Sequence, residues 1–150
     1  MTRRTRFLTI LGLTAVVAFA SVGVASVAPK TKLRHFGHTA KLIVRSDDQH
    51  GRKGPDGKWH DAFLPADFSV ARGARVKVTI LNYDDSPHSF TSPGLHLNEL
   101  VPGAKGKTPG RITFTLTAKK AGKYAWWCNQ PCDPWAMAHD GYMRGFVTVA

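Results

Sequence analysis

The segment from residue 112 to residue 117 alternates apolar and polar side chains without a break. Ile112, Phe114 and Leu116 take every second position, and threonines fill the positions between them. Because successive side chains of a strand point to opposite faces of a sheet, this alternation predicts a strand with one buried face. Strand-like apolar patterns also occur in four other regions, residues 42–44, 68–80, 124–128 and 145–149.

No segment beyond the N-terminal region has helical periodicity of useful length, and the chain has 150 residues. This length favours one domain, and several short strands separated by turns indicate an antiparallel sandwich or barrel. The polar, glycine-rich segment 47–61 is expected to be a loop. The segment 94–110 is expected to be a long connection that covers one end of the sandwich.

The N-terminus predicts export. Arg3, Arg4 and Arg6 precede 22 uncharged residues, 7–28, which include small residues where a signal peptidase cuts. The uncharged run is also long enough to span a bilayer, so residues 1–28 are either a cleaved signal peptide or a retained membrane anchor. Residues 29–40 then form a basic tether, and residues 41–150 form the folded domain. We expect this domain to lie in the cell envelope, where it is periplasmic, extracytoplasmic or membrane-anchored.

The chain is strongly basic, with a formal net charge of +11. Without the three N-terminal arginines the charge is about +8, which would steer an acidic partner, favour anionic lipid headgroups or simply maintain solubility. Nucleic acid is excluded as a partner because the charges are scattered, no binding motif accompanies them, and export separates the protein from DNA.

Both cysteines of the chain lie close to a histidine and a methionine. Cys128, Cys132, His139 and Met143 fall within 16 residues, and His88 lies far upstream. Thiolate, imidazole and thioether together are the ligand set that suits copper. A disulfide between the cysteines is the alternative, but it would close so short a loop that it would stabilise the fold little.

Four motifs occur in a fixed order between residues 67 and 150. They are Phe68-Ser-Val70-Ala-Arg-Gly73, Asp85-x-x-His88-Ser-Phe90, Gly122-x-Tyr124-x-Trp126-x-Cys128 and Gly141-Tyr-Met143-x-Gly145. In this order they resemble the cupredoxin family. The resemblance implies an all-β fold, a cupredoxin-like Greek-key β-sandwich, here preceded by an N-terminal signal or anchor helix. It also implies a copper site built from one strand end and from the loop between the last two strands.

Two versions of the copper site fit the resemblance. In a mononuclear blue-copper site, His88, Cys128 and His139 bind one ion and Met143 is a weak axial ligand. In a binuclear site similar to the CuA domain of cytochrome oxidase subunit II, Cys128 and Cys132 bridge two ions. His88, His139, Met143 and the carbonyl of Gln130 then complete the coordination. Residues 133–138 lengthen this loop relative to the CuA pattern. The extra length puts metal ligation by His139 in question and makes Met137 an alternative to Met143 as the thioether ligand.

The leading hypothesis is an exported electron carrier that cycles between Cu(I) and Cu(II), with one or two copper ions as cofactor. Its expected partner is a redox protein, either acidic or part of a membrane respiratory complex such as an oxidase. Copper delivery or storage is the alternative, and an exported β-domain with a disulfide is the third. No nucleophile and base are paired, so we expect no catalytic residues and no turnover by this chain alone. Asp85 is the residue expected to orient His88.

Overall fold

The computed structural model describes residues 33–150, so the signal peptide or anchor expected in residues 1–28 lies outside the described residues. Within the described part, the elements are almost all strands. In chain order they are β1 (Arg34–Phe36), β2 (Thr39–Arg45), β3 (Arg52–Lys53), β4 (Trp59–His60), β5 (Ala62–Leu64), β6 (Phe68–Val70), β7 (Arg75–Asn82), β8 (His88–Ser92), the 3-10 turn η1 (Pro93–Leu95), β9 (Leu97–Val101), β10 (Gly110–Thr117), β11 (Gly122–Trp127), the short helix α1 (Pro134–Ala138) and β12 (Arg144–Val149).

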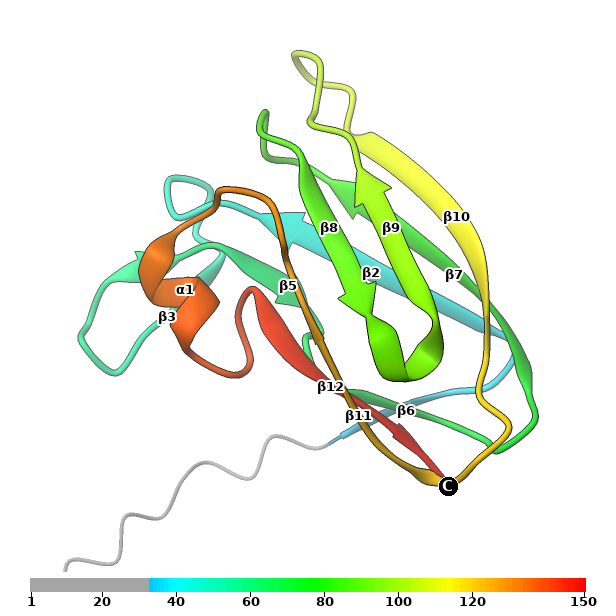
Figure 1. Ribbon diagram of the computed structural model, residues 1–150. Helices are drawn as coiled ribbons and strands as arrows, with labels where there is room; N and C mark the ends of the chain where they lie inside the picture. The colour runs from blue at the N-terminus through cyan, green and yellow to red at the C-terminus, as the bar shows by residue number, and fades with distance from the viewer. Residues whose placement is uncertain (1–32) are drawn as a thin grey trace, which may run out of the picture. The chain divides into compact units, whose positions relative to one another are not determined.

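The strands form two main sheets that make a sandwich (Figure 1). One sheet has six strands in the order β1-β6-β12-β11-β8-β9, and the other has four in the order β10-β7-β2-β5. β3 and β4 form a separate hairpin. The predicted sandwich is confirmed, but the expectation of antiparallel strands is wrong for three pairs, because β1 with β6, β6 with β12, and β2 with β7 pair in parallel. Parallel neighbours need crossover connections, which a local sequence pattern does not reveal.

The alternating segment forms β10, as predicted. Its threonines lie on the outer face, where the hydroxyl of Thr113 is 3.1 Å from that of Thr79 on β7. Leu116 is buried, and Phe114 lies opposite the buried Val78 in the ladder with β7. The period of two therefore set both the strand and its buried face.

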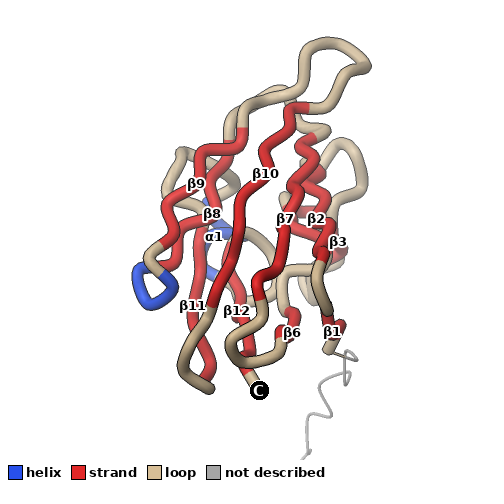
Figure 2. Tube along the Cα trace, turned by 90° about the vertical axis from the view of Figure 1, so that its right-hand side faces the viewer, coloured by secondary structure: helices blue, strands red, loops and turns tan. Residues whose placement is uncertain are grey.

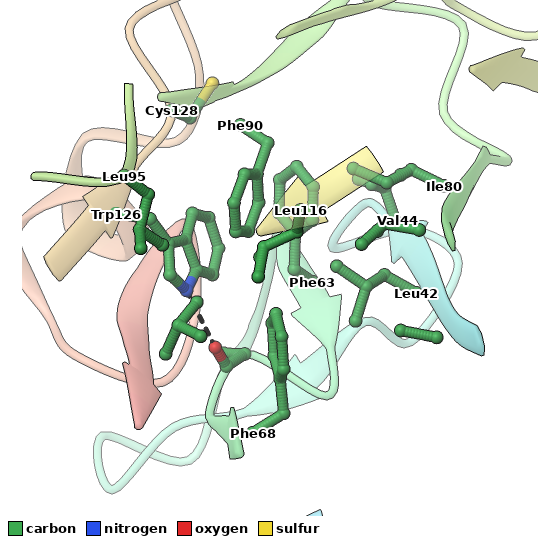
Figure 3. Packing of buried hydrophobic residues seen from close by; sticks show 14 of the residues in the cluster. Leu42, Val44, Phe63, Phe68, Ile80, Phe90, Leu95, Leu116, Trp126 and Cys128 are labelled. Atoms are coloured by element: carbon green, nitrogen blue, oxygen red, sulfur yellow. Dashed lines mark hydrogen bonds between the residues drawn. The ribbon is translucent and has the colours of Figure 1, made fainter. Parts of the chain in front are cut away.

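Trp126 is part of the hydrophobic core and packs beside Phe90 (Figure 3). Its ring stacks on Phe90 at 4.7 Å between centroids and meets Phe63 edge-on at 4.8 Å. Its indole N–H donates to the carbonyl of Ala66 at 2.8 Å, which satisfies the one polar group of this buried side chain. The neighbouring Trp127 points the other way and is 40% exposed. The strand β11 is therefore fixed in register directly before Cys128.

Three segments contain more structure than the sequence suggested. β1 lies within the stretch interpreted as a basic tether, the expected loop 47–61 contains the β3–β4 hairpin, and the connection 94–110 contains β9. β9 pairs with β8 from His88 to Ser92, so this connection supports the strand that carries His88. None of the helices in residues 33–150 has the length and apolarity needed to cross a bilayer.

Candidate metal centre

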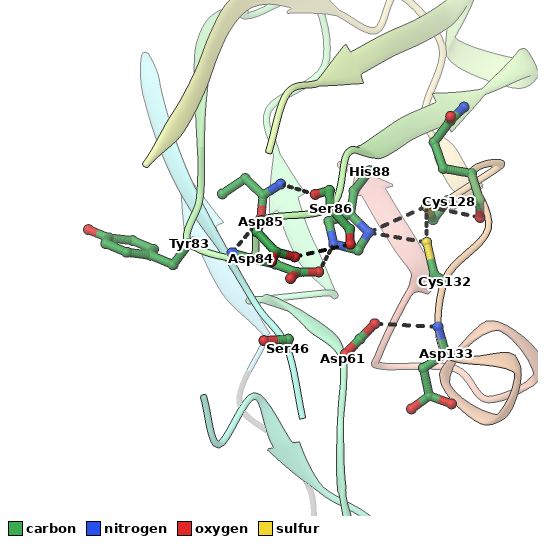
Figure 4. A network of polar contacts seen from close by, with 12 residues as sticks. Ser46, Asp61, Tyr83, Asp84, Asp85, Ser86, His88, Cys128, Cys132 and Asp133 are labelled. Atoms are coloured by element: carbon green, nitrogen blue, oxygen red, sulfur yellow. Dashed lines mark hydrogen bonds and ion pairs between the residues drawn. The ribbon is translucent and has the colours of Figure 1, made fainter. Parts of the chain in front are cut away.

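The sandwich brings His88, Cys128 and Cys132 together at one end (Figure 4). His88 begins β8, Cys128 directly follows β11, and Cys132 lies four residues further on, before α1. The Nδ1 atom of His88 is 3.1 Å from the Sγ atom of Cys132 and 3.8 Å from that of Cys128. The two sulfur atoms are 2.8 Å apart, and both cysteines are free. The donors predicted from two distant stretches of sequence therefore converge.

The imidazole of His88 is oriented from behind by a carboxylate. Its Nε2 atom is 2.8 Å from Oδ2 of Asp84, and both residues are buried. A carboxylate accepts, so Nε2 carries a proton, and in the neutral ring the lone pair of Nδ1 then faces the sulfur atoms. Asp85, the residue expected to orient His88, is exposed and its carboxylate accepts from Ser86 instead. The orienting residue is Asp84, one position earlier.

The loop that carries Asp84 is itself held by Asn82, which is fully buried. The side-chain amide of Asn82 donates to the carbonyls of Ser86 and Pro102, and its Oδ1 accepts from the amide of Asp84. A Cβ atom at Gly103 would overlap the carbonyl of Asp85, so only glycine lets the 102–104 segment pack this closely on the loop. The carboxylate that orients His88 is thus part of a rigid loop.

The two thiols differ in charge. The Cys132 thiol donates a hydrogen bond that lowers the pKa of Cys128 to about 4, with His88 acting in the same direction and burial opposing both. The same hydrogen bond, together with burial, raises the pKa of Cys132. Cys128 is therefore the thiolate of the pair, and Cys132 keeps its proton.

The centre has more buried negative than positive charge. Burial lowers the pKa of His88, but hydrogen bonds to Cys128 and Asp84 raise it, and the net change is upward. Asp61, whose pKa burial raises, lies with Asp84 on the far side of the same imidazole. One imidazole thus lies among a thiolate and two carboxyl groups, a setting that favours a cation. Cysteine sulfur is a soft donor, and imidazole nitrogen also suits copper, so the two facing one another fit this metal.

Cys128 is fixed by hydrogen bonds on both sides. Its amide donates to the carbonyl of Met143 at 2.8 Å, so the two residues lie side by side in the backbone. The hydroxyl of Ser89 accepts from the amide of Asn129 and donates to its side-chain oxygen, which ties β8 to the loop after β11. The carbonyl of Gln130 is 3.8 Å from Sγ of Cys128. The side chain of Met143 is fully buried in the core cluster, and its ligation stays a prediction.

His139 does not join this group in the structure. It is exposed, its ring stacks on Trp135 at 3.7 Å, and its Nδ1 contacts the carbonyl of Trp135 at 2.7 Å. The cause is the extra length of the loop, because residues 134–138 fold into α1 and place His139 at its C-cap. Met137, the competing thioether, is half-buried against the core.

The hairpin of β3 and β4, residues 51–61, holds the long loop in place, and we call it the clasp hairpin. Its Arg52 donates to the carbonyl of Gly141 at 2.7 Å. Its His60 is 2.7 Å from the carboxylate of Asp133 and stacks on Trp135 at 3.8 Å. The sequence predicted only a loop for the segment 47–61 and did not indicate this role of His60. The apolar Trp59 beside His60 within a polar segment was the one signal against that interpretation.

A family model described as a cupredoxin-like domain matches residues 58–149, which is more than half of the chain. The chain belongs to this family. The matched region contains the strands β5 to β12 and all three residues of the metal group, so the sandwich described above is a cupredoxin fold. The four motifs found in the sequence lie within it.

Two solved structures with a TM-score of 0.50 agree with this fold. Dithionite-reduced auracyanin from the photosynthetic bacterium Roseiflexus castenholzii is 17% identical with a TM-score of 0.50, over 75% of this chain and 96% of that one. A multicopper oxidase, mgLAC, is 16% identical with a TM-score of 0.50, and the match covers 76% of this chain and 39% of that one. A purple cupredoxin from Nitrosopumilus maritimus is 22% identical with a TM-score of 0.45, and the match covers 74% of this chain and 99% of that one. A search of curated protein sequences found no match.

Replacing Asp84 by alanine should weaken copper binding while the sandwich still folds. Loss of the carboxylate frees His88 to turn or to change tautomer, and losses of this kind cost about 10–100-fold in metal affinity. Competition with a Cu(I) chelator measures the affinity, and circular dichroism checks the fold. Asp85→Ala is the matched control, because Asp85 is exposed and one residue away. Equal affinities for the two variants would show that Asp84 does not orient His88.

The clasp hairpin predicts a pH-dependent stability. Burial lowers the pKa of His60, but hydrogen bonds to Asp133 and Asp56 raise it, and the net change is upward. A raised folded-state pKa stabilises the fold fully below the unfolded value of about 6.5, and this contribution is lost as pH rises through the folded value. The free energy of unfolding should therefore differ most between wild type and His60→Gln at about pH 5–6 and converge at higher pH. Urea unfolding of the reduced, copper-free protein measures this difference, and a difference that grows with pH would contradict the assignment.

Proposed function

We propose that this protein is a copper electron carrier of the cell envelope, and that His88, Cys128 and Cys132 bind the metal. The supporting observation is the group itself: an imidazole nitrogen lies within 3.1 Å and 3.8 Å of two free cysteine sulfurs. These donors come from β8 and from the loop after β11, and both segments are anchored in the cupredoxin sandwich.

Copper bound to such donors supplies one-electron chemistry between Cu(I) and Cu(II). The residues of this chain contribute rigidity, since a site that rearranges little between the two states transfers electrons with little reorganisation. Asp84 holds the tautomer of His88, the Ser89–Asn129 pair holds the segment after Cys128, and the clasp hairpin holds α1. Burial of His88 and Cys128 keeps bulk water from the centre.

We further propose that both cysteines are ligands, as in the binuclear version of the site. The supporting geometry is the direct contact of the two sulfur atoms, with the carbonyl of Gln130 and the backbone of Met143 close to Cys128. Both versions of the site include His139, which stacks on Trp135 in the structure. They differ at Cys132, because the mononuclear version gives no role to this second sulfur, which lies against Sγ of Cys128.

Copper delivery is the second candidate, and the position of His139 favours it. Two sulfurs and one nitrogen without a second imidazole form a set that suits Cu(I). Cys132 is only half-buried, so a partner has access to one of the donors. Export, a redox partner and association with a respiratory oxidase belong to the leading proposal, and the basic sequence and its N-terminal uncharged run support them. Catalytic turnover by this chain alone is not part of either candidate.

Copper loading with three variants tests the proposal. Adding Cu(II) to the reduced wild-type protein should give an intensely coloured species whose electron paramagnetic resonance spectrum shows hyperfine splitting from two copper nuclei. Cys132→Ser should lose that signal, and His139→Ala should keep it, because His139 lies outside the group in the structure. His88→Ala should bind copper at least about tenfold more weakly than wild type.

Each alternative has its own result. A blue mononuclear signal that survives Cys132→Ser and is lost in His139→Ala would overturn ligation by both cysteines. A protein that binds Cu(I) tightly, stays colourless and passes the ion to a chelating acceptor would support delivery. A protein with no reactive thiols and no bound copper would leave only the disulfide interpretation.

A further inference from the structure

The outer face of the four-stranded sheet carries a basic surface. The neighbouring strands β10, β7 and β2 run side by side across this face (Figure 2). Their outward positions follow from the burial alternation, in which the intervening residues of β2 and β7 are buried in the core. Five of the outward residues are cations, and we call this set the basic face: Lys41, Arg45, Arg75, Lys77 and Arg111.

The register of the strands brings these cations close together. Lys77 on β7 lies opposite Thr39 on β2, and Lys41 lies opposite Thr79, two pairs further along the ladder and on the same face. Arg111 on β10 lies opposite Leu81. A shallow groove of about 390 Å³ runs between these side chains, and it is lined by Thr39, Ala40, Lys41, Lys77, Thr79, Leu81 and Arg111.

Nothing acidic offsets this charge on the face. The three strands contain no aspartate or glutamate. Within residues 33–150, the ion pairs involve His60, His88 and Arg144, and none involves the basic face. Half-buried Ile43 and Leu81 lie next to each other in the ladder between the cations. The face therefore combines unneutralised positive charge with hydroxyl groups and a small apolar row, as surfaces that adsorb to anionic membranes do.

We propose that the basic face docks on a bilayer that contains anionic lipids, with headgroup phosphates bound between Lys41, Lys77 and Arg111. A sheet face presents its cations in one layer, as a membrane surface presents its phosphates. Each Lys or Arg near such a surface adds attraction that decays within a Debye length, so the docking is sensitive to salt. The uncharged run of residues 7–28 precedes β2 in the sequence, which provides a second reason for a membrane near this domain.

The position of the metal group favours lipid over an acidic redox protein as the occupant. Cys128 follows β11, which belongs to the other sheet, and the exposed Trp127 beside it lies on that sheet. A protein docked on β10, β7 and β2 would contact the four-stranded sheet, whereas His88 and Cys128 come from the strands of the other sheet. A membrane in that position leaves the six-stranded sheet and its exposed Trp127 and Leu100 free for a redox partner.

Amine labelling of the full chain on vesicles tests the proposal. The full-length protein is mixed with vesicles of neutral phosphatidylcholine, or of phosphatidylcholine with phosphatidylglycerol, and pulse-labelled with an acylating reagent before mass spectrometry. Lys41 and Lys77 should react at least about threefold more slowly on the anionic vesicles, and high salt should remove the difference. Lys58 on the clasp hairpin and Lys123 on β11 should react equally on both.

Charge reversal provides the matched variants. Arg75→Glu with Arg111→Glu should abolish the protection of Lys41 and Lys77, because both arginines are exposed members of the basic face. Lys119→Glu with Lys120→Glu changes the net charge equally in the exposed turn before β11 and should leave the protection intact. Equal labelling on neutral and anionic vesicles, or protection only after addition of an acidic protein, would overturn the proposal.

Discussion

The candidate metal centre depends on one histidine that is hydrogen-bonded on two sides. His88 donates a hydrogen bond from its Nε2–H group to Asp84 and directs Nδ1 toward the sulfur atoms of Cys128 and Cys132. If the proton were on Nδ1 instead, an N–H group would face the thiols and the lone pair of Nε2 would face the carboxylate, so the ring could not share an ion with the sulfur atoms. The buried Asn82 fixes the loop of Asp84, so the tautomer is set by packing as well as by charge. The cupredoxin sandwich thus prepares the donors before any metal binds.

The second constraint is the length of the loop that carries the cysteines. Residues 134–138 form a helix whose N-cap, Asp133, is one residue after Cys132. The clasp hairpin holds this helix through His60 and reaches Gly141 through Arg52. As a result, the position of Cys132 depends on a hairpin far away in the sequence. In the same arrangement, the exposed ring of His139 stacks on Trp135 and does not join the sulfur atoms.

Much of the fold followed from local patterns. The alternation in β10 and the opposite orientations of Trp126 and Trp127 were predictable, because burial of one sheet face imposes a period of two. The convergence of His88 with both cysteines followed from ligand type and from the family resemblance. The parallel strand pairs, the clasp hairpin and the role of Asp84 did not follow, because each depends on tertiary contacts. One missed signal was local: Asp133 followed by Pro134 is a typical helix start, and it marks the helix that displaces His139.

The central claim is that the Nδ1 atom of His88 binds the metal while Nε2 stays protonated against Asp84. Nitrogen-15 NMR of histidine side chains during titration with Cu(I) tests it most directly, because both ring nitrogens are observed in a diamagnetic state. The account predicts that Nδ1 of His88 shifts on metal binding, that its Nε2 keeps its proton, and that His139 changes little. A protonated Nδ1 of His88 in the loaded protein, with the metal-induced shift at His139 instead, would contradict it.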